Sequence, residues 1–480
     1  MTTKLSEQII SLIKAGNYAK AEELCVKRLK KNSKDCDTLN ILGGLYLTVN
    51  DMSSAFRILK KARKICKNHI QIQNNLGEAY RRAGELEQAF TEFKTSLAIA
   101  PNQSTPQNNI GTIYYQRKEY ANAIKYFQKA IKLRPDFAQA IDNLALAYRG
   151  MGILDDAVQL HIKANNTDDS LRCVYLNLVK TLMFLHSTDD VCNVALSALE
   201  KKTFNQEEIC DLHITLATVF WLTDRQEQFE LIFSSCPAPD RLDNTYHNIK
   251  NITAYYSLLQ SLRTHKSSHP HQYQGNPTAP LFFIGDSHVL SPANIVVKLN
   301  NVEYRVLASI ITGCKAHHLG RDIKDEYKES LKKLLAAYPP SSKIIFGFGE
   351  IDCRREEGFY HLHKTEQKDY RTTVPQTVEK YFNFVLQNAL LHKHYIYFYG
   401  VPAPLESLLS TLSHADRAIS IDIIALFNSS LKLLCQKNTI PFLDTYALTA
   451  NRKGYSNNNY HLDDYHLQPS IINDLFKSQL

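Results

Sequence analysis

Apolar and small residues recur along the first part of the chain with a period of 34 residues. Two successive copies are Leu76–Phe93 and Ile110–Phe127, in which Gly, Tyr, Ala and Phe follow the first apolar residue at the same spacing. Small residues stand where two helices approach closely, and large residues stand where each helix pair packs on the next. Because one helix pair cannot bury its own apolar face, the pattern predicts a stacked α-helical superhelix.

The repeated pattern resembles the tetratricopeptide repeat in both its period and its residue choice. The resemblance covers residues 1–169 and implies a concave surface that binds a protein or peptide, with a purely supporting role as the alternative. Residues 170–263 keep a helical pattern, but the repeat slips by four residues at Leu216 and Ala217. We interpret this second region as degenerate or capping repeats.

A short aperiodic stretch separates the repeats from the rest of the chain. Residues 264–279 contain two prolines, a glycine and three histidines, and they predict a linker. Because these histidines have no carboxylate or thiol beside them in the sequence, a polar linker is favoured over a metal site.

Residues 280–480 alternate between short apolar runs and amphipathic stretches. We expect strands at Leu281–Ile284, Tyr304–Ala308, Lys343–Phe348, Tyr395–Tyr399 and Pro441–Asp444. Helices are expected between them at Asp322–Tyr338, Val374–His392 and His414–Asn438. Near-continuous apolar strands that alternate with helices are typical of a parallel sheet covered on both faces. The pattern therefore predicts a three-layer α/β/α domain, flavodoxin-like in architecture, whose chemistry gathers beyond the carboxyl ends of the strands.

Composition narrows the class of protein. The chain of 480 residues is 44% hydrophobic and 22% charged, which excludes collagen, a disordered chain and a small disulfide-rich protein. A net charge of +8 without a basic stripe predicts no nucleic-acid partner. The ten cysteines show no CxxC spacing and are interpreted as reduced core residues. Because there is no signal-like N-terminus and no apolar run of about 20 residues, we expect a cytoplasmic location without a membrane span.

A candidate nucleophile follows the first expected strand, in Gly285-Asp286-Ser287-His288. Gly285 permits a sharp turn, and Ser287 would lie at the start of a helix. Free backbone N–H groups there stabilise an oxyanion, as the attack of a serine on a carbonyl requires. Asp and Ser are also ordinary helix caps, so this motif alone has a second interpretation.

Two further motifs lie near strand ends and near the C-terminus. Gly347–Arg354 places two glycines and a cluster of charges after the third strand, which is also typical of a tight turn capped by acidic residues. Asp463 and His466 are three residues apart, so one helical turn would put the carboxylate beside the imidazole. An acid that orients a histidine within reach of a serine is the arrangement used for acyl transfer, whereas a polar loop before a last helix is the alternative.

The three motifs, in this order, resemble the SGNH/GDSL hydrolase superfamily over residues 280–480. The resemblance implies that Ser287 is the nucleophile, His466 the general base and Asp463 the residue that orients it. Gly313, after the second strand, matches the family's second block and would donate its N–H to the oxyanion together with Ser287. No metal or organic cofactor is implied. Further oxyanion or substrate contacts are expected from Asp286, His288, Gly349, Glu350, Asp352 and Arg354.

The chain departs from the family in the third block. That block is Gly-x-Asn-Asp, and its Asn side chain completes the oxyanion hole, whereas Ile351 stands at this position here. Loss of one such donor lowers turnover by about 10²–10³. Arg354 or Glu350 would reshape the site, His288 would supply a donor, or the domain would be weakly active or inactive. The Gly-Glu-Ile-Asp-Cys-Arg variant resembles a bacterial SGNH-like branch that is often fused to repeats or to glycan enzymes.

The leading hypothesis is a serine esterase that acts on a small ester, such as an O-acetylated sugar, and whose repeats bind a protein or peptide. Two alternatives stay open: an interaction scaffold with an inactive α/β domain, and acyl transfer to a glycan. The pairs His317/His318 and His361/His363 have no metal-ligand spacing, and Cys353 is interpreted as a strand-end filler rather than a nucleophile.

Overall fold

The computed structural model of the chain consists of two compact units. It describes residues 2–201, 204–239, 242, 249–275, 277 and 279–478, with the backbone alone at 2–4. The first unit contains residues 1–151 and 159–171, and the second contains 152–158 and 172–480.

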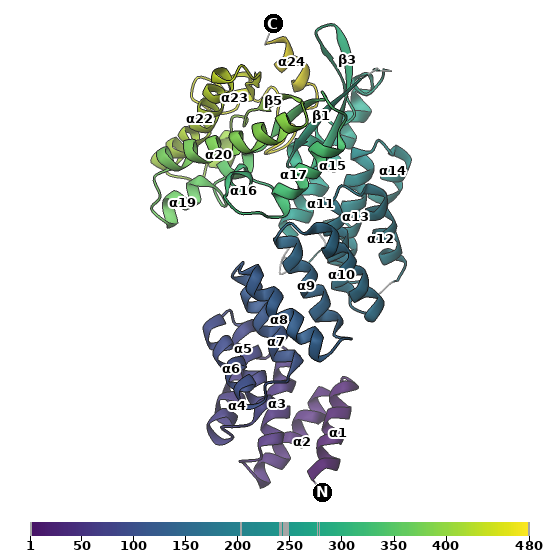
Figure 1. Cartoon of the computed structure of the whole chain (residues 1–480), viewed down its shortest axis with the longest axis vertical. Helices are drawn as coiled ribbons and strands as arrows, with labels where there is room; N and C mark the ends of the chain where they lie inside the picture. The colour runs from purple at the N-terminus through teal and green to yellow at the C-terminus, as the bar shows by residue number, and fades with distance from the viewer. Residues whose placement is uncertain are drawn as a thin grey trace. The chain divides into compact units, whose positions relative to one another are not determined.

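The first unit is a series of helix pairs (Figure 1). The first helices of four successive pairs begin at residues 36, 70, 104 and 138, and their second helices begin at 52, 86, 120 and 154, so the predicted period is confirmed. The helices are α1 (Thr2–Lys14), α2 (Tyr18–Lys31), α3 (Cys36–Thr48), α4 (Met52–Ile65), α5 (Ile70–Arg82), α6 (Leu86–Ile99), α7 (Ser104–Gln116), α8 (Tyr120–Leu133), α9 (Ala138–Gly150) and α10 (Leu154–Thr167).

The alternation of small and large residues corresponds to direct contact inside each helix pair. A Cβ atom on Gly77 would lie 2.7 Å from the ring of Phe93, and one on Gly111 would lie 2.6 Å from the ring of Phe127. Both rings are buried. A larger residue at either glycine would therefore push the two helices of its pair apart.

One cysteine pair departs from the expectation that all cysteines are reduced. Cys36, at the start of α3, and Cys66, just after α4, form a disulfide with their Cα atoms 6.0 Å apart. The expectation is wrong for this pair because the turn of the helix pair brings together two residues that are 30 positions apart. Seven further cysteines carry free thiols: Cys25, Cys192, Cys210, Cys236, Cys314, Cys353 and Cys435.

The helical region continues into the second unit. Its helices are α11 (Arg172–Phe184), α12 (Thr188–Glu200), α13 (Gln206–Leu222), α14 (Gln226–Ser235) and α15 (Ile249–Ser268). Helix α13 begins in phase with the repeat, but it has 17 residues where α11 has 13. This added turn displaces α14 by four residues and explains the slip seen in the sequence.

The expected linker begins inside a helix. Helix α15 extends to Ser268 and is followed by a short 3₁₀ turn, η2 (Pro270–Gln272), while residues 276 and 278 lie outside the described residues. His265 is buried in α15 and its Nε2 lies 3.3 Å from the side-chain oxygen of Gln272. The polar composition of this stretch predicted that the helix ends before residue 264. The buried side chain of His265 instead packs as an apolar residue would, and the helix continues to Ser268.

The described part of the second unit is built around a six-stranded sheet with the order β2-β3-β1-β4-β5-β6. The strands are β1 (Ala279–Gly285), β2 (Val296–Leu299), β3 (Val302–Ile310), β4 (Lys343–Gly347), β5 (Tyr395–Tyr399) and β6 (Phe442–Leu443). Strands β3, β1, β4, β5 and β6 are parallel, but β2 pairs antiparallel with β3. The prediction of a wholly parallel sheet is wrong at this edge, where Asn300 and Asn301, both with positive φ, close a hairpin.

Short and long helices complete this unit. They are η3 (Ser287–Leu290), α16 (Ala316–Gly320), α17 (Glu326–Ala337), α18 (Glu350–Cys353), α19 (Phe359–Thr365), α20 (Tyr370–Leu391), α21 (Glu406–Leu409), α22 (His414–Lys437), α23 (Thr445–Thr449) and α24 (Ile471–Lys477). The ends of the three long helices lie within four residues of the positions expected from the sequence.

Helices cover both faces of the sheet. Phe282 and Ile284 of β1 belong to an apolar cluster with buried residues of α17, α20 and α22. Leu281 and Phe283 point to the other face, where they join buried residues of α13, α15 and α24. The expected boundaries at 170–263, 264–279 and 280–480 thus divide a region that packs as one unit, and helices expected to cap the repeats form one layer of it.

Helix α13 is tied to the sheet by hydrogen bonds as well as by apolar packing. The indole N–H of Trp221 donates to the carbonyl oxygen of Leu290 at 2.8 Å, and the side-chain amide of Asn294 donates to the carbonyl oxygen of Trp221 at 2.6 Å. All three residues are buried. Leu290 ends η3, so this contact fixes the turn that carries Ser287.

Helix α22 is long and apolar enough, by length and composition, to cross a membrane. In this fold its apolar residues Ile423, Phe427 and Leu431 are buried against the sheet. Asn428 donates to the carbonyl oxygen of Val401 and accepts its N–H. These contacts are those of a core helix.

We predict that the sheet requires the helices of residues 172–268 in order to fold. A fragment of residues 152–480 should show near-ultraviolet circular dichroism and cooperative unfolding. A fragment of residues 280–480 should bind a hydrophobic dye and lack both properties, because the face carrying Leu281 and Phe283 would lose α13 and α15 and keep only α24 of its three covering helices. Cooperative unfolding of the shorter fragment, without dye binding, would contradict the prediction.

Candidate functional site

The turn after β1 presents Ser287 beyond the carboxyl edge of the sheet. A Cβ atom on Gly285 would lie 2.4 Å from the carbonyl oxygen of Gly347, so the ends of β1 and β4 approach as closely as glycine allows. The Asp286 carboxylate accepts the N–H of His288 at 3.0 Å and thereby caps η3. Asp286 and His288 are buried, whereas Ser287 is partly exposed.

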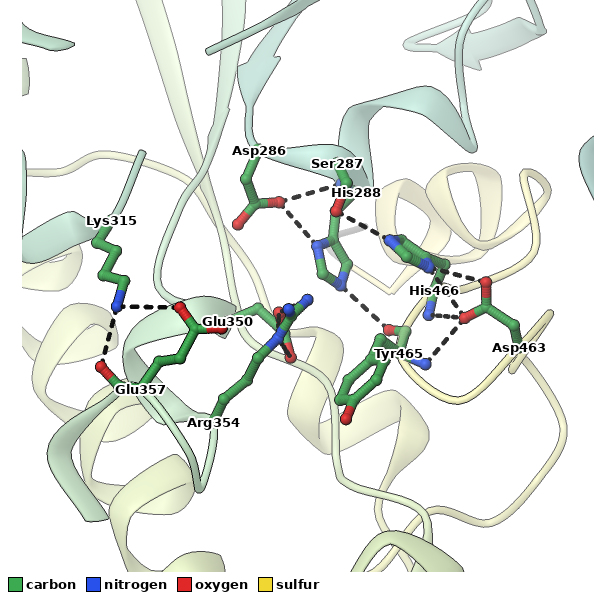
Figure 2. Close-up of polar contacts among 10 residues, drawn as sticks. All are labelled: Asp286, Ser287, His288, Lys315, Glu350, Arg354, Glu357, Asp463, Tyr465 and His466. Atoms are coloured by element: carbon green, nitrogen blue, oxygen red, sulfur yellow. Dashed lines mark hydrogen bonds and ion pairs between the residues drawn. The ribbon is translucent and has the colours of Figure 1, made fainter. Parts of the chain in front are cut away.

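A loop near the C-terminus brings His466 to Ser287 (Figure 2). The Nε2 atom of His466 lies 2.9 Å from the Ser287 hydroxyl oxygen, and its Nδ1 atom lies 2.9 Å from each carboxylate oxygen of Asp463. The loop is not a helical turn: an antiparallel bridge joins His461 to Leu467, and the Asp463 carboxylate accepts the backbone N–H of His466 at 2.7 Å. The expected pairing of acid and imidazole is present, but it is built by a side-chain-capped loop.

The charges in this loop suit a base. Burial favours the protonated form of Asp463, but hydrogen bonding and charge from His466 lower the pKa of that carboxyl to about 2. Burial lowers the pKa of His466, and the Asp463 carboxylate opposes this effect only in part. At neutral pH the imidazole is therefore neutral beside an ionised acid, which is the form able to accept a proton.

Gly313 lies in the loop between β3 and α16, next to the turn that carries Ser287. Its φ of 71° is in the left-handed region that favours glycine. The N–H of Ile311 donates to the carbonyl oxygen of Gly285 at 2.8 Å, which ties this loop to the turn that carries Ser287. Within the described residues, the N–H groups of Gly313 and Ser287 have no acceptor.

The residues of the third motif, Gly347–Arg354, have different structural roles. Gly349 has a φ of 122°, and a Cβ atom there would lie 2.2 Å from the ring of Phe427. Asp352 is buried and accepts the N–H groups of Ala316 at 2.7 Å and His317 at 3.0 Å. Asp352 thus holds the start of α16, next to the Gly313 loop.

Glu350 and Arg354 form an ion pair beside the candidate catalytic residues (Figure 2). The Nε of Arg354 donates to the two carboxylate oxygens of Glu350 at 3.0 and 2.7 Å, and its guanidinium lies 4.5 Å from the centre of the Tyr465 ring. Both residues line a pocket of about 70 Å³. Its other lining residues are Cys353, Arg355, Glu356, Val401, Pro402, Ala403, Pro404, Leu408, Leu409, Ser420, Ile424, His461, Asp464 and Tyr465.

Two aromatic residues of the site carry no signal in the sequence that marks them as functional. The carbonyl oxygen of Tyr465 lies 3.1 Å from His288 Nε2, a backbone role that no residue type reveals. Tyr255 comes from α15, and its hydroxyl interacts with the side chain of Thr312, next to Gly313. Burial and the charge of Asp286 raise the pKa of Tyr255. Only its position on the sheet-facing side of a helix could have pointed to it.

Asp286, His288 and Glu350 bring ligand-type atoms within 4.8 Å of one another, as a metal site would. However, both ring nitrogens of His288 already face acceptors, and Glu350 is bonded to Arg354. These contacts form an alternating set of charges that a cation would disrupt.

Burial raises the pKa of the Cys353 thiol well above its usual value, which disfavours a thiolate nucleophile.

Comparison with known proteins concerns the first part of the chain. Two family models described as tetratricopeptide repeat match residues 68–136 and 108–169. These residues are tetratricopeptide repeats. Neither tetratricopeptide repeat model extends beyond residue 169. No curated protein matches the chain.

Several solved structures are also similar to this chain. A tetratricopeptide repeat protein from Parabacteroides merdae is 16% identical, covers 53% of this chain and 98% of its own, and gives a TM-score of 0.41. TTC0263 from Thermus thermophilus is 23% identical over 38% of this chain and 99% of its own, with a TM-score of 0.34. Pseudomonas aeruginosa pilF is 20% identical over 46% and 99%, with a TM-score of 0.38.

We predict that Asp352, outside the tetratricopeptide repeats, makes the second unit less stable as pH rises. Burial raises its pKa to about 7, whereas an unfolded Asp has a pKa near 4. Its contribution to stability is therefore full below about pH 4 and is lost as pH rises towards 7. Asp352→Asn should remove about 2–4 kcal/mol of the fall in unfolding free energy across this window.

Urea unfolding followed by fluorescence at several pH values measures this effect, because Trp221 is the single tryptophan of the chain and lies in the second unit. Asp463→Asn is the matched control: with a pKa of about 2, Asp463 stays ionised in the folded protein between pH 5 and 7. Equal pH slopes for the wild type and Asp352→Asn would show that the prediction is wrong.

Proposed function

We propose that the second unit is a serine esterase of the SGNH/GDSL type that hydrolyses a small ester. The observation that carries this proposal is the 2.9 Å contact between Ser287 and His466, with Asp463 on the other side of the ring. Ser287 is partly exposed at the carboxyl edge of a mainly parallel sheet, where substrates reach such sites. The order of the motifs along the chain, on which the family resemblance rests, supports the same conclusion.

The proposed reaction has two halves. As Ser287 Oγ attacks the ester carbonyl carbon, its proton passes to His466 Nε2, and Asp463 stabilises the imidazolium that forms. His466 then gives this proton to the leaving alkoxide oxygen, the carbon–oxygen bond breaks, and an acyl-enzyme remains on Ser287. Water attacks the acyl-enzyme while His466 removes its proton, and the return of that proton to Ser287 releases the carboxylic acid.

The oxyanion hole of this enzyme has two donors, the N–H groups of Ser287 and Gly313. Ile351 is buried and supplies no hydrogen bond in place of the usual Asn side chain. His288 does not fill the gap, since both of its nitrogens already face acceptors. We therefore expect turnover about 10²–10³ below that of a three-donor site.

The pocket indicates the kind of ester. Its volume is about 70 Å³, and because neither Ser287 nor His466 lines it, it would hold the part of a small substrate next to the acyl group rather than the acyl group itself. One wall is apolar, with Val401, Ala403 and Ile424, while Arg354 and Asp464 supply polar edges that match the hydroxyl groups of a sugar. An O-acetylated glycan combines these properties. Acyl transfer to a second sugar uses the same residues and differs only in the acceptor.

We predict that Ser287→Ala lowers the kcat/KM for an aryl acetate by at least about 10³-fold, because no other nucleophile accompanies His466. The same serine should be labelled by a fluorophosphonate probe and identified by mass spectrometry. Ser291→Ala is the matched control: Ser291 lies in the same turn region, and its buried hydroxyl has no hydrogen-bond partner within the described residues. Equal hydrolysis by Ser287→Ala and the wild type would remove the esterase and favour an interaction scaffold.

The tetratricopeptide repeats are an interaction scaffold, and their charge indicates the partner. Residues 1–171 contain 25 Lys and Arg against 17 Asp and Glu, whereas the rest of the chain contains 31 of each. The whole net charge of +8 therefore lies in the repeats. We infer an acidic protein or peptide partner, because charge complementarity speeds association and excludes basic competitors.

This inference predicts binding that weakens with salt. The test is fluorescence anisotropy with the full chain and a labelled peptide of alternating Glu and Gly. At about 12 residues this peptide is long enough to span several helices, and it should bind at low ionic strength. Its affinity should fall at least about tenfold between 0.05 and 0.5 M NaCl. A Lys-Gly peptide of the same length is the control and should not bind. Equal binding of both peptides would contradict an acidic partner.

A further inference from the structure

A second histidine–carboxylate pair lies beside the first. His288 Nδ1 is 2.7 Å from an oxygen of Asp286, and His288 Nε2 is 3.1 Å from the carbonyl oxygen of Tyr465 (Figure 2). A carbonyl oxygen can only accept a hydrogen bond, so Nε2 must carry a proton. The nitrogen that faces the carboxylate carries a second proton if that carboxylate is ionised.

The surroundings of Asp286 require a positive partner. Asp286 is 1% exposed, and one of its two oxygens, Oδ2, has no hydrogen bond within the described residues. A buried carboxylate with so few donors is stable as an ion only when a cation touches it. His288 is that contact, while the charge of Arg354 acts from farther away.

The pair also faces the general base. The rings of His288 and His466 lie with their centres 4.8 Å apart. Around His288 lie Asp286 on its own turn, Glu350 of α18, Arg354 just after that helix, and His461 and His466 of the C-terminal loop. Around His466 lie Asp463, His288 and Glu350. His288 is therefore the one positive group in this set that faces His466 directly.

We propose that His288 is a positioning residue held as an imidazolium, which links the Ser287 turn to the loop of His466 and keeps His466 unprotonated by its charge. The link runs from Asp286 through the ring to the carbonyl of Tyr465, the residue before His466. The effect on His466 in catalysis rests on the proposed esterase, whereas the charge state of His288 does not.

Electrostatics agree with this geometry. Burial opposes the charge on His288, but the Asp286 carboxylate raises its pKa to about 9. The positive charge of His288 in turn acts to lower the pKa of His466, after the larger effect of burial. Loss of the cation should therefore make His466 easier to protonate, so that activity is lost at a higher pH on the acidic side.

The first test follows the imidazole nitrogens by NMR in the full chain labelled with ¹⁵N-histidine, with His288→Gln used for assignment. We expect both nitrogens of His288 to be protonated at pH 7, while His466 is neutral. In His288→Gln, the titration of His466 should move up by about one pH unit. One unprotonated His288 nitrogen at pH 7, or an unchanged His466 titration, would overturn the proposal.

The second test separates charge from folding. His288→Gln alone leaves Asp286 as an unpaired buried charge, so we expect it to lower the thermal midpoint. Asp286→Asn/His288→Gln, which removes both charges and keeps amide hydrogen bonds, should recover much of that loss and shift His466 less than the single variant does. If neither variant folds, the nitrogen signals of the wild type decide the charge state.

The third test measures the pH dependence of ester hydrolysis. The acidic limb of kcat/KM for an aryl acetate should move up by about one pH unit in His288→Gln, which is about a tenfold loss on that limb relative to the variant's own plateau. His394→Gln is the control, since His394 is also buried with Nε2 on a carbonyl, that of Leu335, but lies outside the site. An unmoved limb in an active variant would overturn the proposal. An inactive wild type would instead remove the esterase and leave the NMR result to decide the charge of His288.

Discussion

The second unit depends on the burial of one apolar face of its sheet under α13, α15 and α24. Leu281 and Phe283 of β1 share an apolar cluster with residues of these helices, and the strand that carries them runs directly into the turn of Ser287. The hydrogen bond from Trp221 to Leu290 extends the same contact to the far end of that turn. The position of the nucleophile thus depends on α13, a helix that ends more than fifty residues before the sheet begins.

Buried charge is the second organising feature of this region. Asp463, Asp286 and Glu350 each meet a basic side chain, namely His466, His288 and Arg354. Asp352 instead receives two backbone N–H groups. Each of these interactions joins segments that are distant in sequence or fixes a loop next to Ser287. Ion pairs taken out of water are stable only when their geometry is well matched, so they restrict the ways in which these loops can fit together.

Much of this arrangement could be predicted from the sequence because it is recorded in periodic or contiguous patterns. The 34-residue period located the helix pairs, and apolar runs of four to six residues located the central strands. The order of the motifs along the chain was enough to group Ser287, Asp463 and His466 as one set. These signals are local in sequence, or repeat often enough to be recognised.

What the sequence could not show depends on contacts between distant segments. The edge strand β2 has only four residues, too few for an alternating pattern, and its Asn300-Asn301 turn was the only signal. His265 counted as polar although it is buried, and the Cys36–Cys66 disulfide joins residues whose spacing has meaning only once two helices are paired. Tyr255 and the carbonyl of Tyr465 act through position alone.

The added turn of α13 has a consequence for how a chain of this kind can vary in length. The helix pairs from α3 to α12 recur at intervals of 34 residues, so whole copies of 34 residues could be gained or lost among them without changing the repeat frame. After α13 the helices no longer follow the 34-residue period. The last turn of α13 carries Trp221, whose indole N–H donates to the carbonyl oxygen of Leu290, so this end of the helix packs against the sheet domain. Growth or shortening by duplication is therefore confined to the N-terminal side, and the length of the scaffold can change while the distance from α13 to Ser287 stays the same.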